Sequence, residues 1–405
     1  MRKEPWVGPM WISSRYNFGK FRAEMNLPKR VQIYDVTCRD GEQRPGVVFR
    51  KEDKVRIAQK LDEVGIHRIE AGMPAVSADD FEAVKEIAHL GLKAKVVAFS
   101  RARKDDIDLA LKCDVWGVLI EVPSSDALIE QGFNWTKQKV IDFAVEATSY
   151  AKEHGMHVTF FPYDTTRADS GYEKKLMTAV VKQSHPDAIA IVDTFGCATP
   201  FAMAHLVRLV KKWVKLPVEA HCHNDLGLAV ANSLGAVSGG AEVVHTNVNG
   251  IGERSGGAAT EEVAVGLRIL FGLDLGIRYE KLMELSKLVQ DITGIKVPRY
   301  KPVVGDTAFG YEAGIPVMFC RRLSAVDNLK AGLGYLPEFV GNKFVVALGK
   351  KSGGASIEWR LAEMGKTATP EQVDKILTQV KEMSIKNKRE VADEEFKQIV
   401  AEALG

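Results

Sequence analysis

Eight short β-rich runs alternate strictly with eight amphipathic helical stretches between residues 31 and 271, and this alternation restricts the possible folds more than any other feature. Alternating strands and helices predict a parallel sheet, and the count of eight favours a closed (β/α)8 barrel over a doubly wound sheet. The expected strands are Val31–Val36, Arg68–Gly72, Ala94–Phe99, Trp116–Val122, His157–Phe161, Ala188–Val192, Val218–Cys222 and Val243–Val248. The expected helices lie near Lys51–Val64, Ala78–His89, Lys104–Lys112, Thr136–His154, Tyr172–Ser184, Pro200–Val214, Gly227–Ser238 and Ala258–Phe271.

The chain on either side of the expected barrel has a different character. Its first 28 residues are irregular and rich in aromatic side chains, typical of an arm that packs on the body or on a partner chain. After the barrel, Leu273–Lys296 looks helical, and Lys301–Pro316 is Gly-rich and irregular, as in a linker or lid. We therefore expect four parts: an N-terminal arm at 1–28, the barrel at 29–272, a linker or lid subdomain at 273–316, and a small, mostly helical subdomain for the lid or for dimerisation at 317–405.

Composition excludes several classes of function. The formal net charge of +2 is nearly balanced, and no basic stripe with interleaved aromatic residues indicates nucleic-acid binding. No apolar run reaches the length of a membrane span, and the polar N-terminus lacks the apolar centre of a secretory signal. The five cysteines are odd in number and scattered, so they are interpreted as reduced thiols of a cytoplasmic protein.

The stretch His221-Cys222-His223 marks the end of the seventh strand. Residues i and i+2 of a strand point to the same side, so the two imidazoles lie together, and imidazole is a common metal ligand. Two histidines at a strand end are as often packing or surface residues, so the pair alone decides little. Asp40 lies just past the first strand, and in a closed barrel strands one and seven both flank strand eight. Two histidines and one aspartate leave coordination positions open, which favours a catalytic metal site.

Further polar residues follow other strands at the same rim, where barrels of this kind carry their active sites. Glu70 lies at the end of the second strand and Thr194 at the end of the sixth. Arg39 and Gln43 accompany Asp40 in the run after the first strand. The pattern indicates one active site at the carboxyl ends of the strands, although a simple salt bridge of Arg39 with Asp40 is the alternative interpretation.

Several long motifs resemble those of the metal-dependent acyl-CoA condensing barrels, which are the 2-isopropylmalate, homocitrate and citramalate synthases, with hydroxymethylglutaryl-CoA lyase as a relative. Asp-Val-Thr-Cys-Arg-Asp-Gly-Glu-Gln-Arg-Pro-Gly is similar to their first-strand motif, and Ile-Glu-Ala-Gly-Met-Pro to their second. The His-Cys-His-Asn-Asp run and Asn-Gly-Ile-Gly-Glu-Arg are also similar, as is Leu-Gly-Lys-Lys-Ser-Gly in the tail. The matching segments are residues 35–46, 69–74, 221–232, 249–254 and 348–353, in the family's order.

The resemblance implies a metal-dependent condensation. Asp40, His221 and His223 would hold a divalent cation, Mg, Mn, Zn or Co, which acts as a Lewis acid on a 2-oxo acid. A base would remove a proton from the methyl group of acetyl-CoA, and the enolate would attack the keto carbon. Hydrolysis of the thioester would then release CoA.

Other residues receive roles from the same resemblance. Arg39 would bind substrate and stabilise the developing alkoxide, Thr194 would bind the substrate carboxylate, and Gln43 would orient groups near the metal. Glu70 is open between a role in the substrate pocket and a structural role.

The sequence departs from the family at several places near the expected site. Tyr163 stands where the synthases have a glutamate, and Gly257 stands where they often have an asparagine. The lid motif His-Glu-x-Gly-Ile-His appears here as Tyr311-Glu312-Ala313-Gly314-Ile315-Pro316, without either histidine. The run after the fourth strand, residues 124–128, also lacks the histidine usual in isopropylmalate synthases. Tyr163 or Tyr311 could serve as acid or base, with packing as the alternative, so the catalytic candidates are Arg39, Tyr163, Tyr311 and Glu312.

The resemblance therefore implies an acyltransferase that joins an acyl-CoA to a 2-oxo acid, giving a 2-hydroxy-2-alkyl dicarboxylic acid and CoA. Two alternatives stay open: a metal-dependent carbon–carbon lyase or aldolase on the same barrel, and a non-catalytic barrel that binds a metabolite or partner. In the family the tail is typically exchanged between subunits, which implies a homodimer.

Overall fold

The computed structural model describes residues 4–405, so the first three residues of the predicted arm lie outside the described part. The chain divides into two compact units. One comprises Ser14–Lys296, and the other combines residues 4–13 with Val297–Gly405. Within residues 4–405, no helix has the length and apolar character that crossing a membrane requires.

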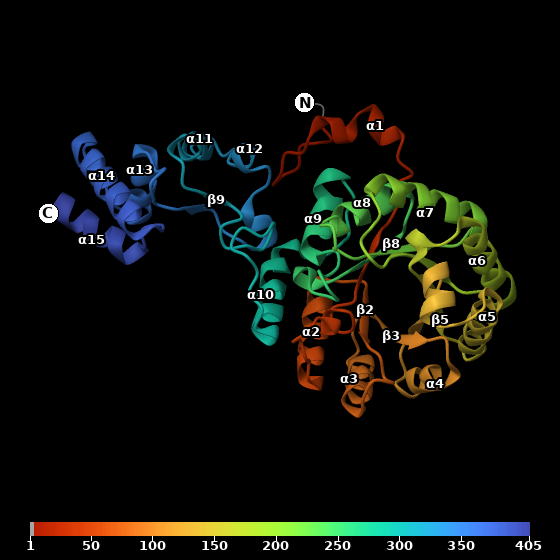
Figure 1. Ribbon diagram of the computed structural model, residues 1–405. Helices are drawn as coiled ribbons and strands as arrows, with labels where there is room; N and C mark the ends of the chain where they lie inside the picture. The colour runs from red at the N-terminus through yellow and green to blue at the C-terminus, as the bar shows by residue number, and fades with distance from the viewer. Residues whose placement is uncertain (1–3) are drawn as a thin grey trace. The chain divides into compact units, whose positions relative to one another are not determined.

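The first unit is a closed barrel of eight parallel strands, as the alternating pattern predicts (Figure 1). Its strands follow in chain order around the barrel, and β1 closes it by pairing with β8, with Gln32 opposite Val243. The strands are β1 Gln32–Asp35, β2 Arg68–Gly72, β3 Lys95–Arg101, β4 Gly117–Pro123, β5 His157–Tyr163, β6 Ala188–Asp193, β7 Val218–Cys222 and β8 Val243–Thr246. The (β/α)8 prediction is thereby confirmed.

A helix follows each strand and packs on the outside of the barrel. These helices are α2 Lys51–Val64, α3 Ala78–His89, α4 Lys104–Lys112, α5 Lys137–Glu153, α6 Ser170–Ser184, α7 Pro200–Val214, α8 Ala229–Gly239 and α9 Thr260–Leu270. Several begin at a side-chain cap: Thr199 accepts a hydrogen bond from the backbone N–H of Ala202, and Pro200 occupies the first turn, where its missing N–H costs nothing.

The helix expected over Leu273–Lys296 is shorter than predicted. Only α10, Leu282–Thr293, is α-helical, preceded by a single 3-10 turn at Tyr279–Lys281. Gly272 and Gly276 have φ angles of 65° and 69°, which lie outside the right-handed helical region and interrupt the pattern. The sequence shows apolar residues at helical spacing there, but the backbone is irregular.

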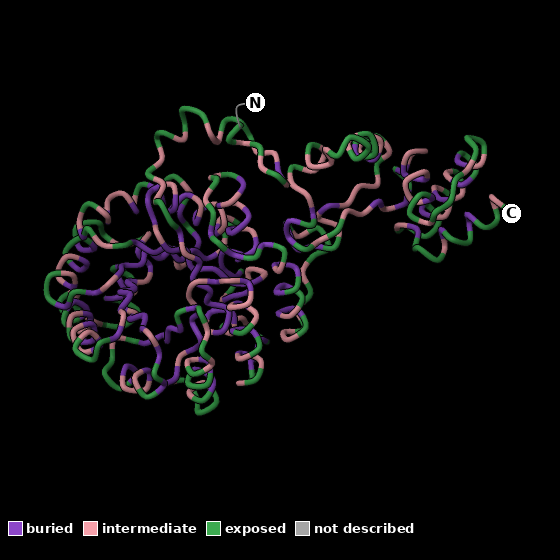
Figure 2. The backbone as a smooth tube through the Cα atoms, turned by 180° about the vertical axis from the view of Figure 1, so that it is seen from behind, coloured by how far each residue is buried: buried purple, intermediate pink, exposed green. Residues whose placement is uncertain are grey.

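The barrel interior is filled by side chains of alternate strand positions, and Figure 2 shows the strands as a mostly buried ring. One interior cluster is apolar and comprises Tyr34, Val36, Val97, Phe99, Leu119, Phe161, Ala190, Val192 and Val243. Next to it, Glu219 of β7 accepts hydrogen bonds from Arg68 Nη1 at 2.7 Å and His245 Nε2 at 2.8 Å. Burial alone would raise the pKa of Glu219, but the His245 hydrogen bond and the Arg68 charge lower it to about 2.

The second unit has a hydrophobic core of its own. A two-stranded sheet pairs β9 Gly310–Tyr311 with β10 Val345–Val346. The helices are α11 Gly314–Ser324, α12 Lys330–Leu333, α13 Gly354–Glu363, α14 Pro370–Asn387 and α15 Asp393–Leu404. Side chains of the last three form a buried cluster that includes Ile357, Ile376 and Phe396. The end of the mostly helical subdomain predicted at 317–405 thus contains α14 and α15 as separate helices, divided where Lys388 adopts a φ of 51°.

Candidate active site

The first turn after β1 brings Asp40 to the carboxyl-end rim of the barrel. Asp35 Oδ1 accepts a hydrogen bond from the Thr37 backbone N–H at 3.0 Å, and Asp35 Oδ2 accepts one from Thr260 Oγ1 at 2.8 Å. The Asp40 N–H then donates to the Val36 carbonyl at 2.8 Å, which closes the turn. Asp35 and Thr37 therefore fix the backbone that carries Asp40, a structural role.

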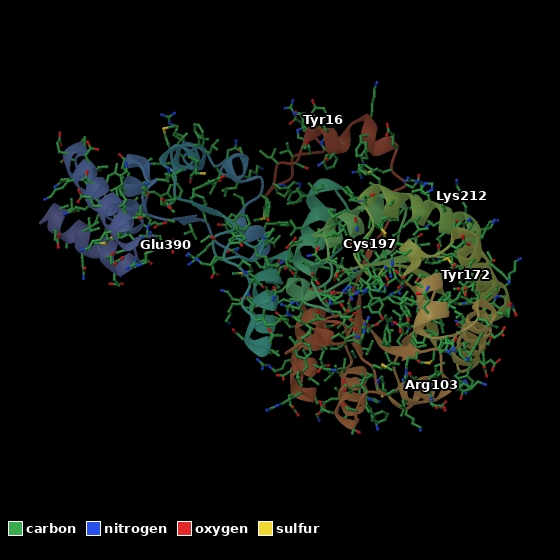
Figure 3. All side chains as sticks on the ribbon, viewed as in Figure 1. Tyr16, Arg103, Tyr172, Cys197, Lys212 and Glu390 are labelled. Atoms are coloured by element: carbon green, nitrogen blue, oxygen red, sulfur yellow. The ribbon has the colours of Figure 1, made fainter. Side chains whose placement is uncertain are left out.

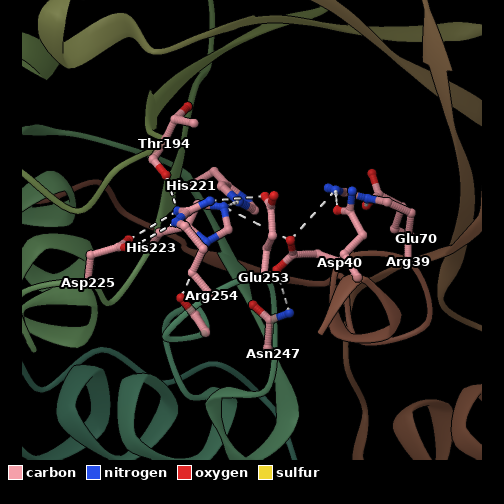
Figure 4. A network of polar contacts seen from close by, with 12 residues as sticks. Arg39, Asp40, Glu70, Thr194, His221, His223, Asp225, Asn247, Glu253 and Arg254 are labelled. Atoms are coloured by element: carbon pink, nitrogen blue, oxygen red, sulfur yellow. Dashed lines mark hydrogen bonds and ion pairs between the residues drawn. The ribbon is translucent and has the colours of Figure 1, made fainter. Parts of the chain in front are cut away.

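Asp40, His221 and His223 converge, as Figure 4 shows, and all three are buried. One ligand atom from each lies within 4.8 Å of the others. The two Nε2 atoms are 3.1 Å apart, and His223 Nε2 lies 4.0 Å from Asp40 Oδ1. Three possible metal ligands from two strands separated by β8 thus meet at one point.

The unpaired atoms of this group fit a divalent cation. Asp40 Oδ1 is buried without a hydrogen-bond partner, and burying a carboxylate oxygen in this way is costly unless a cation or donor satisfies it. Two nitrogens each about 2.1 Å from one ion, at right angles, lie about 3 Å apart, close to the spacing of the two Nε2 atoms. Burial and the neighbouring imidazoles lower the pKa of His221 well below its usual value, so its imidazole stays neutral, as a metal ligand must be.

Asn247, which sequence reasoning missed, supports the ligand group. Its Nδ2 donates to Asp40 Oδ2 at 2.9 Å, while His223 Nδ1 lies 3.3 Å from the Gly256 carbonyl oxygen. A Cβ at Gly257 would come within 2.2 Å of Asn247 Oδ1. The Asn247 carboxamide therefore occupies the space beside the position where the synthases often carry asparagine, and Gly257 leaves room for it.

Arg39 lies beside the ligand group and is held by several contacts. Its Nε donates to Glu70 Oε2 at 2.5 Å and its Nη1 to Gln43 Oε1 at 2.8 Å, and the guanidinium lies 4.3 Å from the Phe99 ring centroid. Burial opposes the charge of Arg39, but Glu70 and Asp40 more than offset this and raise the pKa. Arg39 Nη2 is buried and has no partner, so one donor is left for a substrate oxygen.

Two predicted substrate-binding residues differ in their access to the cavity. Glu70 is fully buried, accepts from Tyr34 OH at 3.1 Å and from Arg39, and does not line the cavity. It positions Arg39. Thr194 does line the cavity, and its Oγ1 accepts the Asp164 backbone N–H at 2.8 Å. Gln43 lines it as well.

The cavity over the ligand group has a volume of about 420 Å³. Its lining includes all three possible ligands, Arg39, the apolar side chains of Phe99 and Phe161, and the polar ends of β4 and β5. A second cavity of about 620 Å³ adjoins it and shares three lining residues, Arg101, Glu121 and Tyr163. Arg103 lines the outer cavity and lies at the periphery of the barrel near α4 (Figure 3).

Tyr163 and Glu121 form the β4–β5 edge of the first cavity. Burial raises the pKa of Tyr163, with Glu121 and Asp164 adding to the rise, so the phenol stays protonated at neutral pH. Burial also raises the pKa of Glu121 to about 7, although the Arg39 charge opposes this. Glu121 was missed because one acid in an otherwise apolar strand produces no periodic signal; its presence in that strand was the only available clue.

The two remaining candidates lie in the second unit. Tyr311 OH donates to the Gly332 carbonyl at 3.0 Å, and Glu312 Oε1 accepts the Lys351 backbone N–H at 2.7 Å. Both side chains are therefore engaged within residues 297–405. Their catalytic roles stay a prediction.

The HMGL-like family profile matches residues 30–289, which covers more than half of the chain and all eight barrel strands. This chain belongs to the HMGL-like family. Its barrel is also similar to solved structures, among them the HMG-CoA lyase of Bacillus subtilis, with a TM-score of 0.61 and 20% identity over 68% of this chain and 97% of that one. That likeness supports the fold alone.

Curated relatives place the chain among the condensing synthases. In Methanocaldococcus jannaschii, a protein named homocitrate synthase is 42% identical, covering 93% of this chain and 91% of the relative. Its 2-isopropylmalate synthase is 41% identical over 94% of this chain and 73% of the relative. Its (R)-citramalate synthase is 41% identical over 93% and 75%. The predicted family and enzyme class, acyl-condensing synthases, are thereby confirmed.

The three relatives also show what similarity leaves undecided. Proteins with three different named products, all from one organism, have nearly equal identity to this chain. Overall identity therefore does not select the 2-oxo acid, and the selection has to be argued from the cavity.

Proposed function

We propose that this enzyme condenses an acyl-CoA, in the first instance acetyl-CoA, with a 2-oxo acid in a divalent-metal-dependent reaction. The observation that carries the proposal is the convergence of Asp40, His221 and His223 beside the unpaired Nη2 of Arg39 in one cavity. Condensation requires stabilisation of negative charge on the former keto oxygen, and a cation with a guanidinium supplies it.

Each residue on the side of the cavity that carries Asp40, His221 and His223 has a defined task in this reaction. Asp40, His221 and His223 would hold the cation, which when bound polarises the keto group of the 2-oxo acid. Arg39, held in place by Glu70 and Gln43, directs its free N–H group at the developing alkoxide. Thr194 offers a hydroxyl hydrogen to the substrate carboxylate.

Tyr163 acts as an acid. A raised pKa keeps its phenol protonated, and no hydrogen-bond partner of that hydroxyl is present within residues 4–405, so the proton is free for transfer or donation. A phenol with a raised pKa is a poor base at neutral pH. The base that deprotonates the acyl group is therefore a different residue.

The test is free-thiol release from acetyl-CoA with pyruvate, 2-oxoisovalerate, 2-oxoglutarate, oxaloacetate and phosphonopyruvate, each with and without chelator. The proposal expects thiol release that depends on one or more 2-oxo acids, stops with chelator, and returns on addition of Mn²⁺ or Mg²⁺. No thiol release with any of the five acids in metal-loaded protein would contradict the proposal. A search for 2-oxo acid released from hydroxy acids or acyl-CoA adducts would then test the lyase alternative.

We also propose that the enzyme is a homodimer in which the C-terminal region is exchanged between subunits. The proposal rests on the resemblance of the tail motif at 348–353 to the synthases and on the hydrophobic core that the tail forms by itself. Light scattering after gel filtration should give twice the mass of the chain. A fully active monomer at assay concentration would contradict it.

A further inference from the structure

The β4–β5 edge of the cavity carries a carboxyl group to which the proposed function assigns no role. Glu121 belongs to β4, two residues after Leu119 of the apolar interior cluster, so both side chains point into the barrel. It lines the cavity that also contains Asp40, His221 and His223. Its neighbours in the lining include the apolar side chains of Phe99, Phe161 and Leu128 as well as Arg101 and Tyr163.

Cationic side chains near Glu121 are already paired with other acids. Arg101 makes a two-pronged contact with Asp106, with Nε to Oδ2 and Nη2 to Oδ1 both at 2.8 Å. Arg39 is bound to Glu70 and Gln43. Within the described residues, 4–405, the Glu121 carboxyl group has neither a hydrogen-bond nor an ion-pair partner. A partly buried carboxyl without a partner is costly, unless a ligand supplies one.

We propose that Glu121 selects the substrate: it accepts a hydrogen bond from a neutral donor, such as a hydroxyl group, at the far end of the 2-oxo acid and disfavours dicarboxylic 2-oxo acids. This inference rests on the proposed function and names its substrate class. A second carboxylate beside Glu121 would meet like charge, because Arg101 is held by Asp106, and Arg39 is held by Glu70 and Gln43 with its remaining N–H group beside the possible metal ligands. A purely apolar end would leave Glu121 unsatisfied in an apolar wall, and a site built for a hydrogen bond rejects such analogues strongly.

Three substrates separate these cases at one position. In 4-hydroxy-2-oxobutanoate the fourth carbon bears a hydroxyl, in 2-oxopentanoate it bears a methyl, and in oxaloacetate it is itself the carboxylate carbon, so the three acids differ at their far end. Homologues one carbon longer test the same three end groups deeper in the cavity. We expect kcat/KM for the hydroxy acid to exceed both others by about tenfold or more. Equal kcat/KM values across the series would overturn the proposal.

Two variants test whether Glu121 causes the preference. Glu121→Leu should lose the preference for the hydroxyl and improve use of 2-oxopentanoate, and Glu121→Gln should improve use of oxaloacetate by about tenfold. The matched control is Glu153→Gln, an exposed acid on α5, which should leave every ratio unchanged. Survival of the wild-type preference in both Glu121 variants would overturn the proposal, and circular dichroism establishes that each variant is folded.

The pH dependence of the preference gives a second readout. The charged and titratable groups that act on Glu121 are Arg39, Arg101, Glu70 and Glu253, and Tyr163 lines the same edge. Because the pKa of Glu121 is about 7, discrimination against oxaloacetate should grow as pH rises from 6 to 8. Glu121→Gln should show a flat ratio over that range. A wild-type ratio that does not change would contradict the inference.

Binding measurements separate failure of this inference from failure of the proposed function. Calorimetric titration of the three acids into Mn²⁺-loaded protein, without acetyl-CoA, reports the preference as Kd values. Thiol release with no preference among the three acids would contradict the inference about Glu121 but not the proposed function. Absence of thiol release would contradict the function, while the Kd order would still decide whether Glu121 selects the far end of the ligand.

Discussion

Two edges of one cavity differ in how completely their polar groups are engaged. At the edge formed by β1, β7 and β8, hydrogen bonds hold the side chains of Asp40 and Arg39 in place through Asn247 and Glu70, and the atoms left unpaired are Asp40 Oδ1, Arg39 Nη2 and His221 Nδ1. At the edge formed by β4 and β5, Glu121 and Tyr163 have no such partners within residues 4–405. The first edge is therefore preorganised for a reaction, and at the second edge the polar groups of Glu121 and Tyr163 can bind a substrate.

The difference follows the sequence motifs. Most of the engaged edge comes from segments that match the condensing synthases, with Gly257 as a departure, and the open edge carries the Tyr163 departure. Shared chemistry with a variable 2-oxo acid would produce this division, and the near-equal identity to three differently named synthases agrees with it. Variants at each edge should therefore fail in different ways.

The largest effect is expected at the ligand group itself. His221→Ala removes one of three possible ligands, so bound metal should fall from about one per chain to near zero and kcat by about a thousandfold or more. Metal content by mass spectrometry and thiol release measure the two quantities. His89→Ala, an exposed imidazole paired with Asp114, is the control. Full metal content in His221→Ala would contradict the assignment.

Tyr163→Phe should have the next largest effect on turnover. Removing a general acid typically costs about a hundredfold or more, and metal content should be unchanged because Tyr163 is not a ligand. Its raised pKa also predicts no loss of wild-type activity from phenol ionisation up to about pH 10. The control is Tyr150→Phe, which removes a hydroxyl that donates to Asp108. An unchanged kcat in Tyr163→Phe would mean that Tyr163 has a packing role only.

Asn247→Ala should weaken metal binding about tenfold to a hundredfold, because partners that orient ligands contribute this much to affinity. Activity of Asn247→Ala should recover at high metal concentration, whereas activity of His221→Ala should not. Titration of metal-free protein with Mn²⁺ gives the affinity. An unchanged affinity would mean that Asp40 is oriented by its backbone turn alone.

The smallest effect on turnover is expected from Glu219→Gln, in the interior layer beside the ligand group. The folded-state pKa of Glu219 is about 2, below the ordinary 4.5, so its stabilisation is present above pH 4.5 and is lost as pH falls towards 2. The variant should lose about 3 kcal/mol at pH 7, and less near pH 3. Urea unfolding measures both values, with Glu284→Gln on the surface as control. Equal losses at the two pH values would contradict the assignment.

The sequence predicted the barrel well because its elements repeat with clear periods. Lys51–Val64, Ala78–His89 and Pro200–Val214 are helices at their predicted bounds, and the strand-end rule correctly predicted that Asp40 lies beside the histidine pair. The rule works because carboxyl ends of parallel strands share one rim.

Other features depend on contacts that no local pattern encodes. Asn247 is one polar residue after a buried strand, and only its distance to Asp40 and the space over Gly257 reveal its role. Glu121 sits in an apolar run, and its importance comes from the pairing of Arg101 and Arg39 elsewhere. The irregular backbone before α10 includes Gly272 and Gly276 with positive φ angles, which hydrophobic spacing does not reveal.

The most direct test of the central claim is the ratio of kcat/KM for 4-hydroxy-2-oxobutanoate to that for oxaloacetate, measured side by side in Asn247→Ala and Glu121→Gln at a Mn²⁺ concentration that saturates the wild type but not Asn247→Ala. If the two edges divide chemistry from selection, Asn247→Ala lowers both values together and keeps the ratio within about twofold, while Glu121→Gln changes it by about tenfold. A ratio that moves with Asn247, or stays fixed without Glu121, would contradict the division.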